Sequence, residues 1–207
     1  MLEQKSLKNA LRLETLPELR QAVQSCRGCD LYKHATQAVC GEGPQTSSIV
    51  FIGEQPGDEE DRQGKPLVGP AGRLLDRALS DVGIDRLAVY VTNALRHFKF
   101  EERGKRRIHK KPNGTELKAC RPWLEAEVAL IRPSIIVCLG AIAAQSVFGP
   151  KWRVTKERGR FVEHPWAPHA TSTIHPSAIL RATDPGRAKD MRSMLLADLR
   201  QARAIAA

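Results

Sequence analysis

Apolar residues along the chain form two recurring patterns, short continuous runs and stripes at helical spacing. Continuous runs cover 48–53, 87–93 and 134–140, and such runs are typical of strands buried on both faces. The pattern returns to strand near Arg160 and over 170–174. Between these runs apolar residues recur every three or four positions, which predicts intervening helices.

The predicted helices have recognisable starts. Apolar spacing predicts helices over 16–26 and 74–82. Thr115 is the predicted cap of a third, longer helix. Asp184 and Pro185, a good cap followed by a good first helical residue, open the closing helix.

Strands that alternate with helices predict an α/β fold. We expect a three-layer α/β/α sandwich around a central, mainly parallel four-stranded sheet, and one domain over residues 1–207 because no linker rich in Gly, Ser or Pro divides the chain. Sites in such folds lie beyond the carboxyl ends of the strands. The loops that begin at Glu54, Ala94 and His175 each follow a predicted strand, so we expect them to meet in one crevice.

Charge and cysteine content narrow the class of partner. Lys and Arg outnumber Asp and Glu by 33 to 23, and a surplus of +10 favours a polyanionic partner, nucleic acid first and an anionic membrane surface second. No apolar run reaches the length of a bilayer span and the first residues lack a secretory pattern, so we expect a cytoplasmic monomer. Five cysteines favour metal binding or burial over disulfides.

One basic stretch carries candidate chemistry. Residues 103–111 read R-G-K-R-R-I-H-K-K, with neither strand nor helix periodicity. Such a run is commonly a solvated loop or a phosphate-binding patch. It also surrounds His109 with cations, which disfavour protonation and leave the imidazole a free lone pair beside a bound polyanion. A nucleophile delivered to nucleic acid would have this pattern.

Several motifs taken together resemble the uracil-DNA glycosylase superfamily. The matching segments are G-E-Q-P-G-D-E-E-D with G-K-P-L-V-G-P-A-G, V-T-N-A-L-R-H-F-K-F, K-R-R-I-H-K-K-P and H-P-S-A-I-L-R. With a Cys26-Arg27-Gly28-Cys29 knuckle they extend in order to Arg181, and the inserted K-R-R-I-H segment is similar to the UdgX type within the iron-sulfur branch. The resemblance implies a base excision repair enzyme. It would flip uracil out of single- or double-stranded DNA, excise it, and become covalently attached to the abasic sugar through His109.

The resemblance also implies a [4Fe-4S] cluster. Cys26 and Cys29 can point two sulfurs at one metal, and related proteins take two further ligands from segments that correspond to His97 and Cys120. We therefore expect ligation by these four residues. Zinc is the alternative metal on ligand type alone, and His97 is alternatively a surface loop histidine. The remaining cysteines, Cys40 and Cys138, are expected to behave as small buried hydrophobes.

Base recognition is assigned to residues that follow the first two predicted strands. The carboxamide of Asn93 can pair with the uracil edge, and Gln55 is expected to assist. Leu67 occupies the position where relatives carry a stacking phenylalanine, so either base affinity is lower or a ring such as Phe98 compensates. Ser177, in the turn after the last strand, is the further substrate-binding candidate. The expected phosphate contacts come from the basic stretch and the last motif: Arg106, Arg107, Lys110, Lys111 and Arg181.

The catalytic assignment has three parts. His175 is expected to donate a hydrogen bond to the departing uracil anion, although a histidine before proline is by itself commonly a turn residue. Glu54 is expected to orient the His109 imidazole, and Asp58 lies on the acidic loop that prepares the attacking water in related hydrolytic enzymes. The neighbouring acids, 59–61, are expected to form a solvated turn.

Three functions remain open on the sequence. The first is a single-turnover uracil-DNA glycosylase that ends attached to DNA. The second is a multiple-turnover enzyme in which His109 contacts only phosphate or base. The third is a non-catalytic iron-sulfur module that binds nucleic acid.

Overall fold

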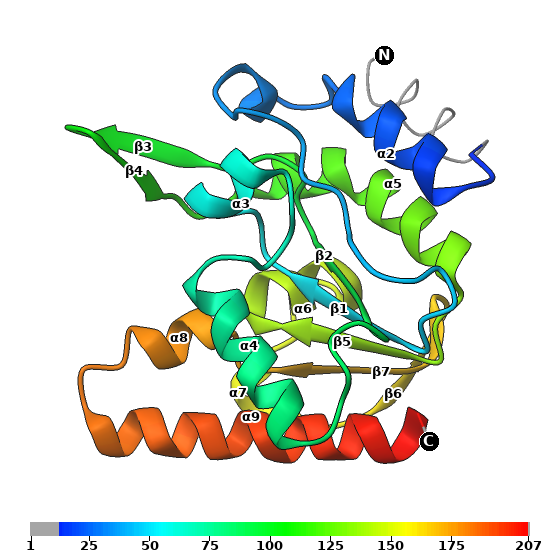
Figure 1. Ribbon diagram of the computed structural model, residues 1–207, viewed down its shortest axis with the longest axis vertical. Helices are drawn as coiled ribbons and strands as arrows, with labels where there is room; N and C mark the ends of the chain where they lie inside the picture. Colours follow the sequence, from blue (N-terminus) through cyan, green and yellow to red (C-terminus); the bar gives the residue numbers. More distant parts are fainter. Residues whose placement is uncertain (1–12, 207) are drawn as a thin grey trace.

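A central sheet of five strands organises the molecule, which the computed structural model describes over residues 13–206 (Figure 1). The strand order is β2-β1-β5-β7-β6, and the first four strands are parallel. The strands of this sheet are β1 (Ile49–Gly53), β2 (Tyr90–Asn93), β5 (Ile135–Leu139), β6 (Val162–His164) and β7 (Ala167–Thr173). Because parallel strands end at one edge, the loops after β1, β2, β5 and β7 share that edge.

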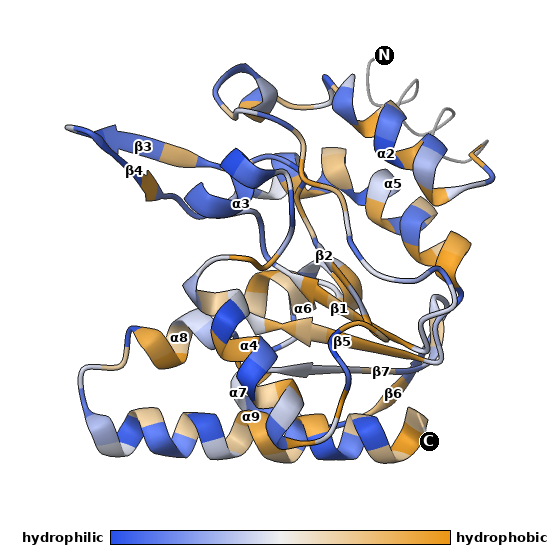
Figure 2. Cartoon of the chain, in the orientation of Figure 1, coloured by the Kyte–Doolittle hydropathy of each residue, from blue (hydrophilic) through white to orange (hydrophobic). Residues whose placement is uncertain are grey.

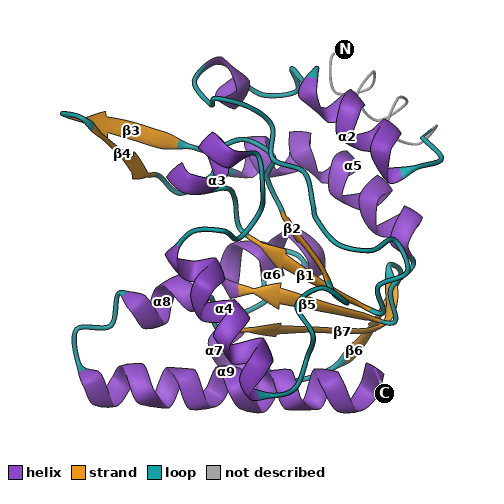
Figure 3. Cartoon of the chain, in the orientation of Figure 1, coloured by secondary structure: helices purple, strands orange, loops and turns teal. Residues whose placement is uncertain are grey.

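Helices cover both faces of the sheet (Figure 3). Their bounds are α2 (Leu16–Gln24), α3 (Asp58–Gln63), α4 (Pro70–Asp81), α5 (Gly114–Ile131), α6 (Gly140–Phe148), α7 (Val154–Glu157), α8 (Pro176–Leu180) and α9 (Pro185–Ala206), with a 3₁₀ turn, η1, over Asp30–Lys33. Helices α4 and α9 pack on one face, whereas α5 and α6 pack on the other. The predicted α/β/α layering is therefore confirmed.

Alternation of side chains along the strands explains the two-sided packing. In β1, Phe51 points into the core beneath α4 and α9, whereas Val50 and Ile52 point into the core beneath α5 and α6. Both sets are fully buried, which is why the strands read as continuous apolar runs (Figure 2). Over the described residues, no helix combines the length and the apolar character needed to span a bilayer.

The sheet differs from the expectation in strand number and direction. It has five strands rather than four, because the segment near Arg160 forms β6 and pairs antiparallel with β7 at the sheet edge. An antiparallel edge strand needs only a short connection, and residues 165–166 supply it. The sheet is thus mixed rather than uniformly parallel.

The basic stretch that lacked any periodicity forms a two-stranded hairpin that projects from the body of the molecule (Figure 1). Strands β3 (Phe100–Arg103) and β4 (Arg106–His109) pair antiparallel, with Phe100 opposite His109. Gly104 has a φ of 60° in the two-residue turn, a conformation that glycine adopts without steric cost. Much of the hairpin is exposed, so its sequence carries no alternation of buried and exposed positions.

Helix starts were predicted with mixed success. Asp184 caps α9 as expected, since its carboxylate accepts a hydrogen bond from the Arg187 amide at 2.6 Å. The cap of α5 is Asn113 rather than Thr115: the Asn113 side chain accepts from the amide of Glu116, and the Glu116 carboxylate accepts in return from the Asn113 amide. This reciprocal capping satisfies two amide groups at once, which a threonine two positions later could not do.

Candidate active site

A cavity of about 360 Å³ opens at the carboxyl ends of the parallel strands. The loops after β1, β2 and β7 all contribute to its wall, together with the end of the β3–β4 hairpin. The expected crevice therefore exists. Eight predicted site residues line it: Glu54, Gln55, Asp58, Leu67, Asn93, His109, His175 and Ser177.

His109 ends strand β4 with about half of its side chain exposed at the cavity. Its Nε2 lies 2.8 Å from Nε2 of Gln55 and 3.7 Å from Oε1 of Glu54. An amide nitrogen can only donate, so His109 Nε2 is the acceptor and the proton of the neutral ring sits on Nδ1. Burial, and then the nearby Arg181 guanidinium, lower the pKa of His109, which favours this neutral form.

The residue that orients His109 is Gln55 rather than Glu54. A separation of 3.7 Å is too long for a hydrogen bond, so the Glu54 carboxylate does not fix the imidazole ring in this structure. Burial raises the pKa of Glu54, and the charges of Arg181 and Lys111 partly oppose that rise. The sequence placed both residues at the site and expected Glu54 to orient the imidazole, whereas the hydrogen bond comes from the neighbouring Gln55. Spacing alone cannot distinguish adjacent side chains on one loop.

Gln55 also clamps the base of the hairpin. Its Oε1 accepts from the amide of Lys99 at 3.1 Å, and its Nε2 donates to the carbonyl of Lys110 at 2.9 Å. Lys99 precedes β3 and Lys110 follows β4, and the two are joined by a backbone hydrogen bond of 2.9 Å. One buried amide therefore fixes both ends of the segment that carries His109.

His175 is the N-cap of α8 and has a defined tautomer. Its Nδ1 accepts from the backbone amide of Ser177 at 3.1 Å and lies 2.7 Å from the Ser177 hydroxyl. A backbone amide must donate, so Nδ1 carries no proton and the neutral ring is protonated at Nε2. Burial, followed by the charges of Arg181 and His109, lowers the pKa of His175 to about 4. The ring is therefore a neutral Nε2–H donor at physiological pH.

Two glycines allow the site residues to approach the strands closely. A Cβ on Gly140 would lie 2.8 Å from Cβ of His175, and Gly140 has a φ of 85°. A Cβ on Gly53 would lie 2.3 Å from Oδ1 of Asn93. Asn93 ends β2 and is 3% exposed. Within residues 13–206 its carboxamide has no hydrogen-bond partner, so it is free to bind a ligand in the cavity.

Leu67 lines the cavity in a strained backbone conformation. Its φ of 53° lies in the left-handed region, which costs a non-glycine residue roughly 1 kcal/mol or more. The start of α4 holds it there, since a Cβ on Gly72 would lie 1.6 Å from the Leu67 carbonyl oxygen. Phe98 does not supply a ring to the cavity wall. It packs against Phe100, with its ring centroid 6.1 Å from that of His109.

Arg107 is bound within the protein instead of projecting toward solvent. Its guanidinium donates to Asp58 and, at 2.6 Å, to Asp61, and its side chain is only 14% exposed. It also lies over the rings of Phe98 and Phe100, 5.5 Å and 5.0 Å from their centroids. The expectation of a free phosphate contact is therefore wrong for this arrangement, in which Arg107 ties the hairpin to α3.

The acids after Asp58 are not the solvated turn that was expected. Asp61 is fully buried and accepts hydrogen bonds from the amide and hydroxyl of Thr36. Glu60 is 7% exposed and accepts from the amides of Gly57 and Gly69. These carboxylates satisfy backbone donors around the cavity, because the loop folds back over α3 in a way that sequence spacing does not reveal.

Leu180 and Arg181 also line the cavity. Leu180 ends α8 with 48% of its surface exposed, and Arg181 follows it. Arg181 was expected to brace the DNA strand, and its charge affects the pKa of three cavity residues, Glu54, His109 and His175. Leu180 was assigned no role. Its only sequence indication is its position in the H-P-S-A-I-L-R segment.

Cys26 and Cys120 lie in one buried cluster between α2 and α5, and the partly buried Cys29 packs against it. Each sulfur accepts a hydrogen bond: Cys26 from the Trp123 indole at 3.1 Å, Cys120 from the Arg96 amide at 3.2 Å, and Cys29 from the backbone of Leu31. Such donors stabilise cluster-bound thiolates. In the described part of the chain, no three metal-binding side chains converge tightly enough to hold a single ion.

His97, Cys40 and Cys138 are also buried. His97 is 5% exposed, so the alternative of a surface loop histidine is wrong. Burial and the charge of Arg27 lower the pKa of His97 to about 4, which leaves its imidazole neutral. Cys40 and Cys138 are buried as expected, and Cys138 lies within β5. Thiols and a neutral imidazole are ligand types that iron-sulfur clusters use.

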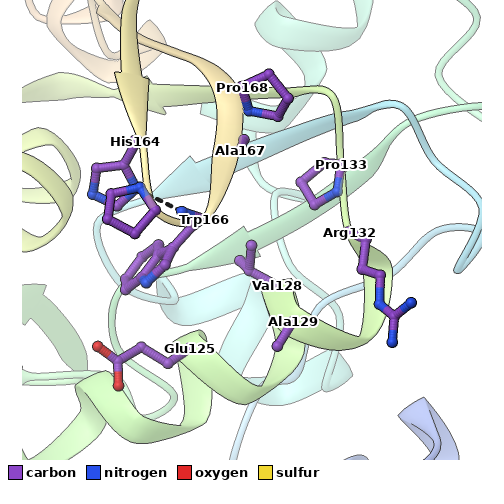
Figure 4. A pocket seen from close by; sticks show the side chains of 10 residues that line it. Glu125, Val128, Ala129, Arg132, Pro133, His164, Trp166, Ala167 and Pro168 are labelled. Atoms are coloured by element: carbon purple, nitrogen blue, oxygen red, sulfur yellow. Dashed lines mark hydrogen bonds between the residues drawn. The ribbon is translucent and has the colours of Figure 1, made fainter.

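Another cavity, of about 390 Å³, lies at the opposite edge of the sheet (Figure 4). Arg132 and Pro133 precede β5, and His164 and Trp166 flank the turn between β6 and β7. None of the predicted site residues lines it. It is at the amino ends of β5 and β7, away from the loops that carry His109 and His175.

Comparison with known proteins points to one family. The sequence model of the Uracil DNA glycosylase superfamily matches residues 40–200. A Type-4 uracil-DNA glycosylase of Thermotoga maritima is 36% identical over 193 residues, which cover 93% of this chain and 95% of the relative. A Type-4 uracil-DNA glycosylase of Archaeoglobus fulgidus is 35% identical and covers 81% of this chain and 84% of its own length.

Proposed function

The chain belongs to the uracil DNA glycosylase superfamily, and from this premise we propose that it excises uracil from DNA and then becomes covalently attached to the abasic deoxyribose through His109. Uracil-DNA glycosylase activity has the support of the family and of the relatives. The observation that carries the covalent step is the position of His109, whose neutral imidazole faces the cavity that Asn93 and His175 share.

Base recognition is assigned to Asn93 and Leu67. The unpaired carboxamide of Asn93 can donate to uracil O4 and accept from uracil N3–H. Cytosine presents the opposite donor and acceptor, so discrimination against it requires the Asn93 amide to keep one orientation. Leu67 offers the flipped base an apolar contact from a rigid backbone position.

His175 is assigned to the departing base. Cleavage of the bond between the sugar C1′ and uracil N1 leaves the electron pair on uracil and positive charge on the sugar. The Nε2–H of His175, fixed by the Ser177 amide, can donate to the developing negative charge at uracil O2. The lowered pKa keeps the His175 ring neutral. A neutral imidazole is a very weak acid, so this hydrogen bond stabilises the anion without transferring the proton.

The capture step then uses the His109 lone pair. Nε2 forms a bond to C1′ of the sugar cation, the ring becomes a cationic alkylimidazole, and Nδ1 releases its proton to solvent, while the uracil anion takes a proton from water. Glu54, 3.7 Å from Nε2, places a carboxylate where positive charge develops. Gln55 must release Nε2 before the bond forms, and its amide keeps a second acceptor in the Lys110 carbonyl.

The cluster belongs to the proposal as a structural group. Cys26, Cys29, Cys120 and His97 would hold a [4Fe-4S] cluster, and the support is the buried thiol group with its three N–H donors and a neutral imidazole. Bound there, the cluster would cross-link α2, the segment after β2 and α5. The chemistry of base excision requires no electron from it.

A multiple-turnover glycosylase is the second candidate. Glu54 lines the cavity with a raised pKa and could activate a water molecule, while Gln55 occupies the His109 lone pair. A non-catalytic binding module is the third reading, and the convergence of Asn93, His175 and Glu54 in one cavity argues against it.

The deciding experiment measures product against protein. Purified protein is incubated with a uracil-containing single-stranded oligonucleotide, and free uracil, abasic sites and protein–DNA adduct are quantified by denaturing gel and mass spectrometry. The proposal expects one uracil released and one adduct formed per protein molecule. More abasic sites than protein would establish turnover instead, and binding without any uracil release would leave only the binding module.

A further inference from the structure

A groove between α5 and α6 lies beside the active site and has no role in the reaction described above. Its cavity measures about 460 Å³. Its lining includes the buried Ala94, which directly follows Asn93, and the exposed Lys111, two residues beyond His109. The groove shares no lining residue with the catalytic cavity, but these two residues place one end of it next to that cavity.

The groove has an aliphatic floor and a positively charged rim. Leu117, Leu124 and Ile142 supply aliphatic side chains. The charged lining residues are Lys111, Lys118 and Arg121, and no carboxylate is among the lining residues. Arg121 is paired with Glu125 and donates to the Ser146 carbonyl at 2.6 Å.

The two lysines leave the groove positively charged. Over residues 13–206, neither Lys111 nor Lys118 has a carboxylate partner within 4 Å, and both are exposed. Lys111 is nevertheless close enough to the active site for its charge to lower the pKa of Glu54. Uncompensated cations on an apolar groove attract a flexible polyanion.

Gly114, the first residue of α5, lines the groove. Its φ is not in the left-handed region, so the backbone does not require glycine there. A Cβ added at Gly114 would meet no atom within 4 Å. The effect of glycine at this position is to leave the wall of the groove without a side chain.

We propose that this groove binds the nucleotides that flank the flipped uracil, as a single strand whose phosphates contact Lys111 and Lys118. The inference rests on the proposed function, because it requires DNA in the neighbouring cavity. A strand that leaves that cavity past Lys111 reaches the Lys111 end of the groove. The aliphatic floor would contact sugars and bases without reading sequence.

An acidic peptide with aliphatic side chains has similar chemistry but fits the position less well. Its site would include Lys111, whose charge acts on Glu54 in the catalytic cavity, so the peptide and a strand leaving that cavity would compete for the same cation. The position of Lys111 therefore favours DNA as the occupant.

Binding of uncleavable DNA tests the groove directly. Single-stranded oligonucleotides carry 2′-fluoro-2′-deoxyuridine, which resists excision, at the centre, at the 5′ end or at the 3′ end. Affinity is measured by fluorescence anisotropy at several salt concentrations. The variants are Lys118→Glu, which reverses a rim charge, and Gly114→Phe, which fills the groove. Lys189→Glu, an exposed lysine on α9, is the matched control.

The groove predicts a directional pattern. Wild-type protein should bind the oligonucleotide with the uracil analogue at its centre more tightly than one of the two that carry it at an end. The end that weakens binding lacks the nucleotides that enter the groove, so this comparison identifies the side of the uracil that the groove binds. Lys118→Glu should weaken binding of oligonucleotides that carry nucleotides on this side about fivefold to tenfold. It should also reduce the salt slope, the slope of log affinity against log salt concentration, by about 0.7, the value for one phosphate contact on single-stranded DNA. Gly114→Phe should weaken binding of the same oligonucleotides. The oligonucleotide that has no nucleotides on the groove side of the uracil analogue should bind equally well to all of the proteins.

Three results would overturn the groove assignment. The first is wild-type affinity of both variants for every oligonucleotide. The second is an equal loss in Lys189→Glu, which would reveal a general charge effect. The third is binding of a synthetic peptide of alternating Glu and Leu that DNA does not displace, which would make the occupant a protein. Failure of wild-type protein to release uracil would refute the proposed function separately, because the binding comparison does not depend on cleavage.

Discussion

Nε2 of Gln55 lies 2.8 Å from Nε2 of His109, so an amide holds the nitrogen that we assign to the sugar. The same Gln55 side chain bonds the backbone at Lys99 and Lys110, on both sides of the hairpin. Orientation of the imidazole and position of the hairpin are thus controlled by one buried residue. In this structure the amide therefore occupies the Nε2 lone pair.

Replacement of Gln55 by Ala should therefore affect capture more than excision. Loss of the clamp frees both hairpin ends, and misplacement of a reacting group by about 1 Å can cost about 100-fold in rate. We expect slower adduct formation with a smaller effect on uracil release, measured by single-turnover quench experiments. Gln63→Ala, at an exposed position on α3, is the control. Equal loss of both steps would contradict a positioning role.

His109→Ser removes the lone pair that we assign to the sugar. Adduct should be undetectable on a denaturing gel, while His175 and Asn93 remain in place to support uracil release. Water can then reach the sugar beside Glu54, so more than one uracil per protein is expected. If the variant still forms the adduct, another nucleophile is responsible and the assignment of His109 is wrong.

His175→Ala should slow excision itself. Loss of one preorganised donor to a developing anion typically costs about 3 kcal/mol, a factor of about 10² to 10³ in the single-turnover rate of uracil release. Binding of uncleavable uracil DNA should change much less, because the donor acts mainly in the transition state. Ser177→Ala removes only the hydroxyl contact and keeps the amide that fixes the tautomer, so it should be much milder.

The pH dependence of capture follows from the lowered pKa of His109. Neutral imidazole is required, so the rate should stay constant as pH falls to about 6.5, the ordinary value, and decline only below it, as pH passes through the lowered pKa. Arg181→Gln removes a charge that lowers the pKa of both His109 and His175. The decline should then begin at higher pH, whereas Arg187→Gln on α9 should leave the profile unchanged. An unshifted profile in Arg181→Gln would show that this charge does not control protonation.

Neighbouring arginines on β4 should have different functions. Arg107→Ala leaves the buried Asp61 with its Thr36 hydrogen bonds but without its cation, and loss of a hydrogen bond between charged groups costs roughly 1.5–3 kcal/mol in free energy of unfolding. Arg106 is exposed, so Arg106→Ala should leave stability unchanged and reduce the salt slope of DNA binding by about 0.7. Urea unfolding and salt titrations distinguish the two. A larger salt effect in Arg107→Ala than in Arg106→Ala would mean that Arg107 leaves its carboxylates to bind DNA.

Sequence patterns predicted most of the fold because burial imposes a period on buried elements. Strand β5 and helix α9 were readable from apolar runs, a helical stripe and the Asp184 cap. The β3–β4 hairpin was not readable, since most of it is exposed and nothing selects an alternating pattern there. Edge strand β6 has only three residues, too few to establish a period or a direction.

The sequence predicted which residues form the candidate site. It did not predict their hydrogen-bond and ion-pair partners. Glu54, Asn93 and His175 follow three parallel strands, so topology alone brings them to one edge. The partners of Arg107 and Asp61 depend on how two loops far apart in the sequence pack together, which no local pattern encodes. The same is true of the choice between Glu54 and Gln55 as the partner of His109.

The sequence by itself determined which chemical groups the site contains and which strand each of them follows. It could do so because apolar periodicity identifies the buried strands and the chain order gives the residues after each one. Only the tertiary structure decided which of those groups touch. Gln55 rather than Glu54 holds His109, and Arg107 is bound to acids instead of facing DNA. The physical reason is that hydrogen bonds and ion pairs depend on distances of a few tenths of an ångström, and these are fixed by packing between loops rather than by spacing along the chain.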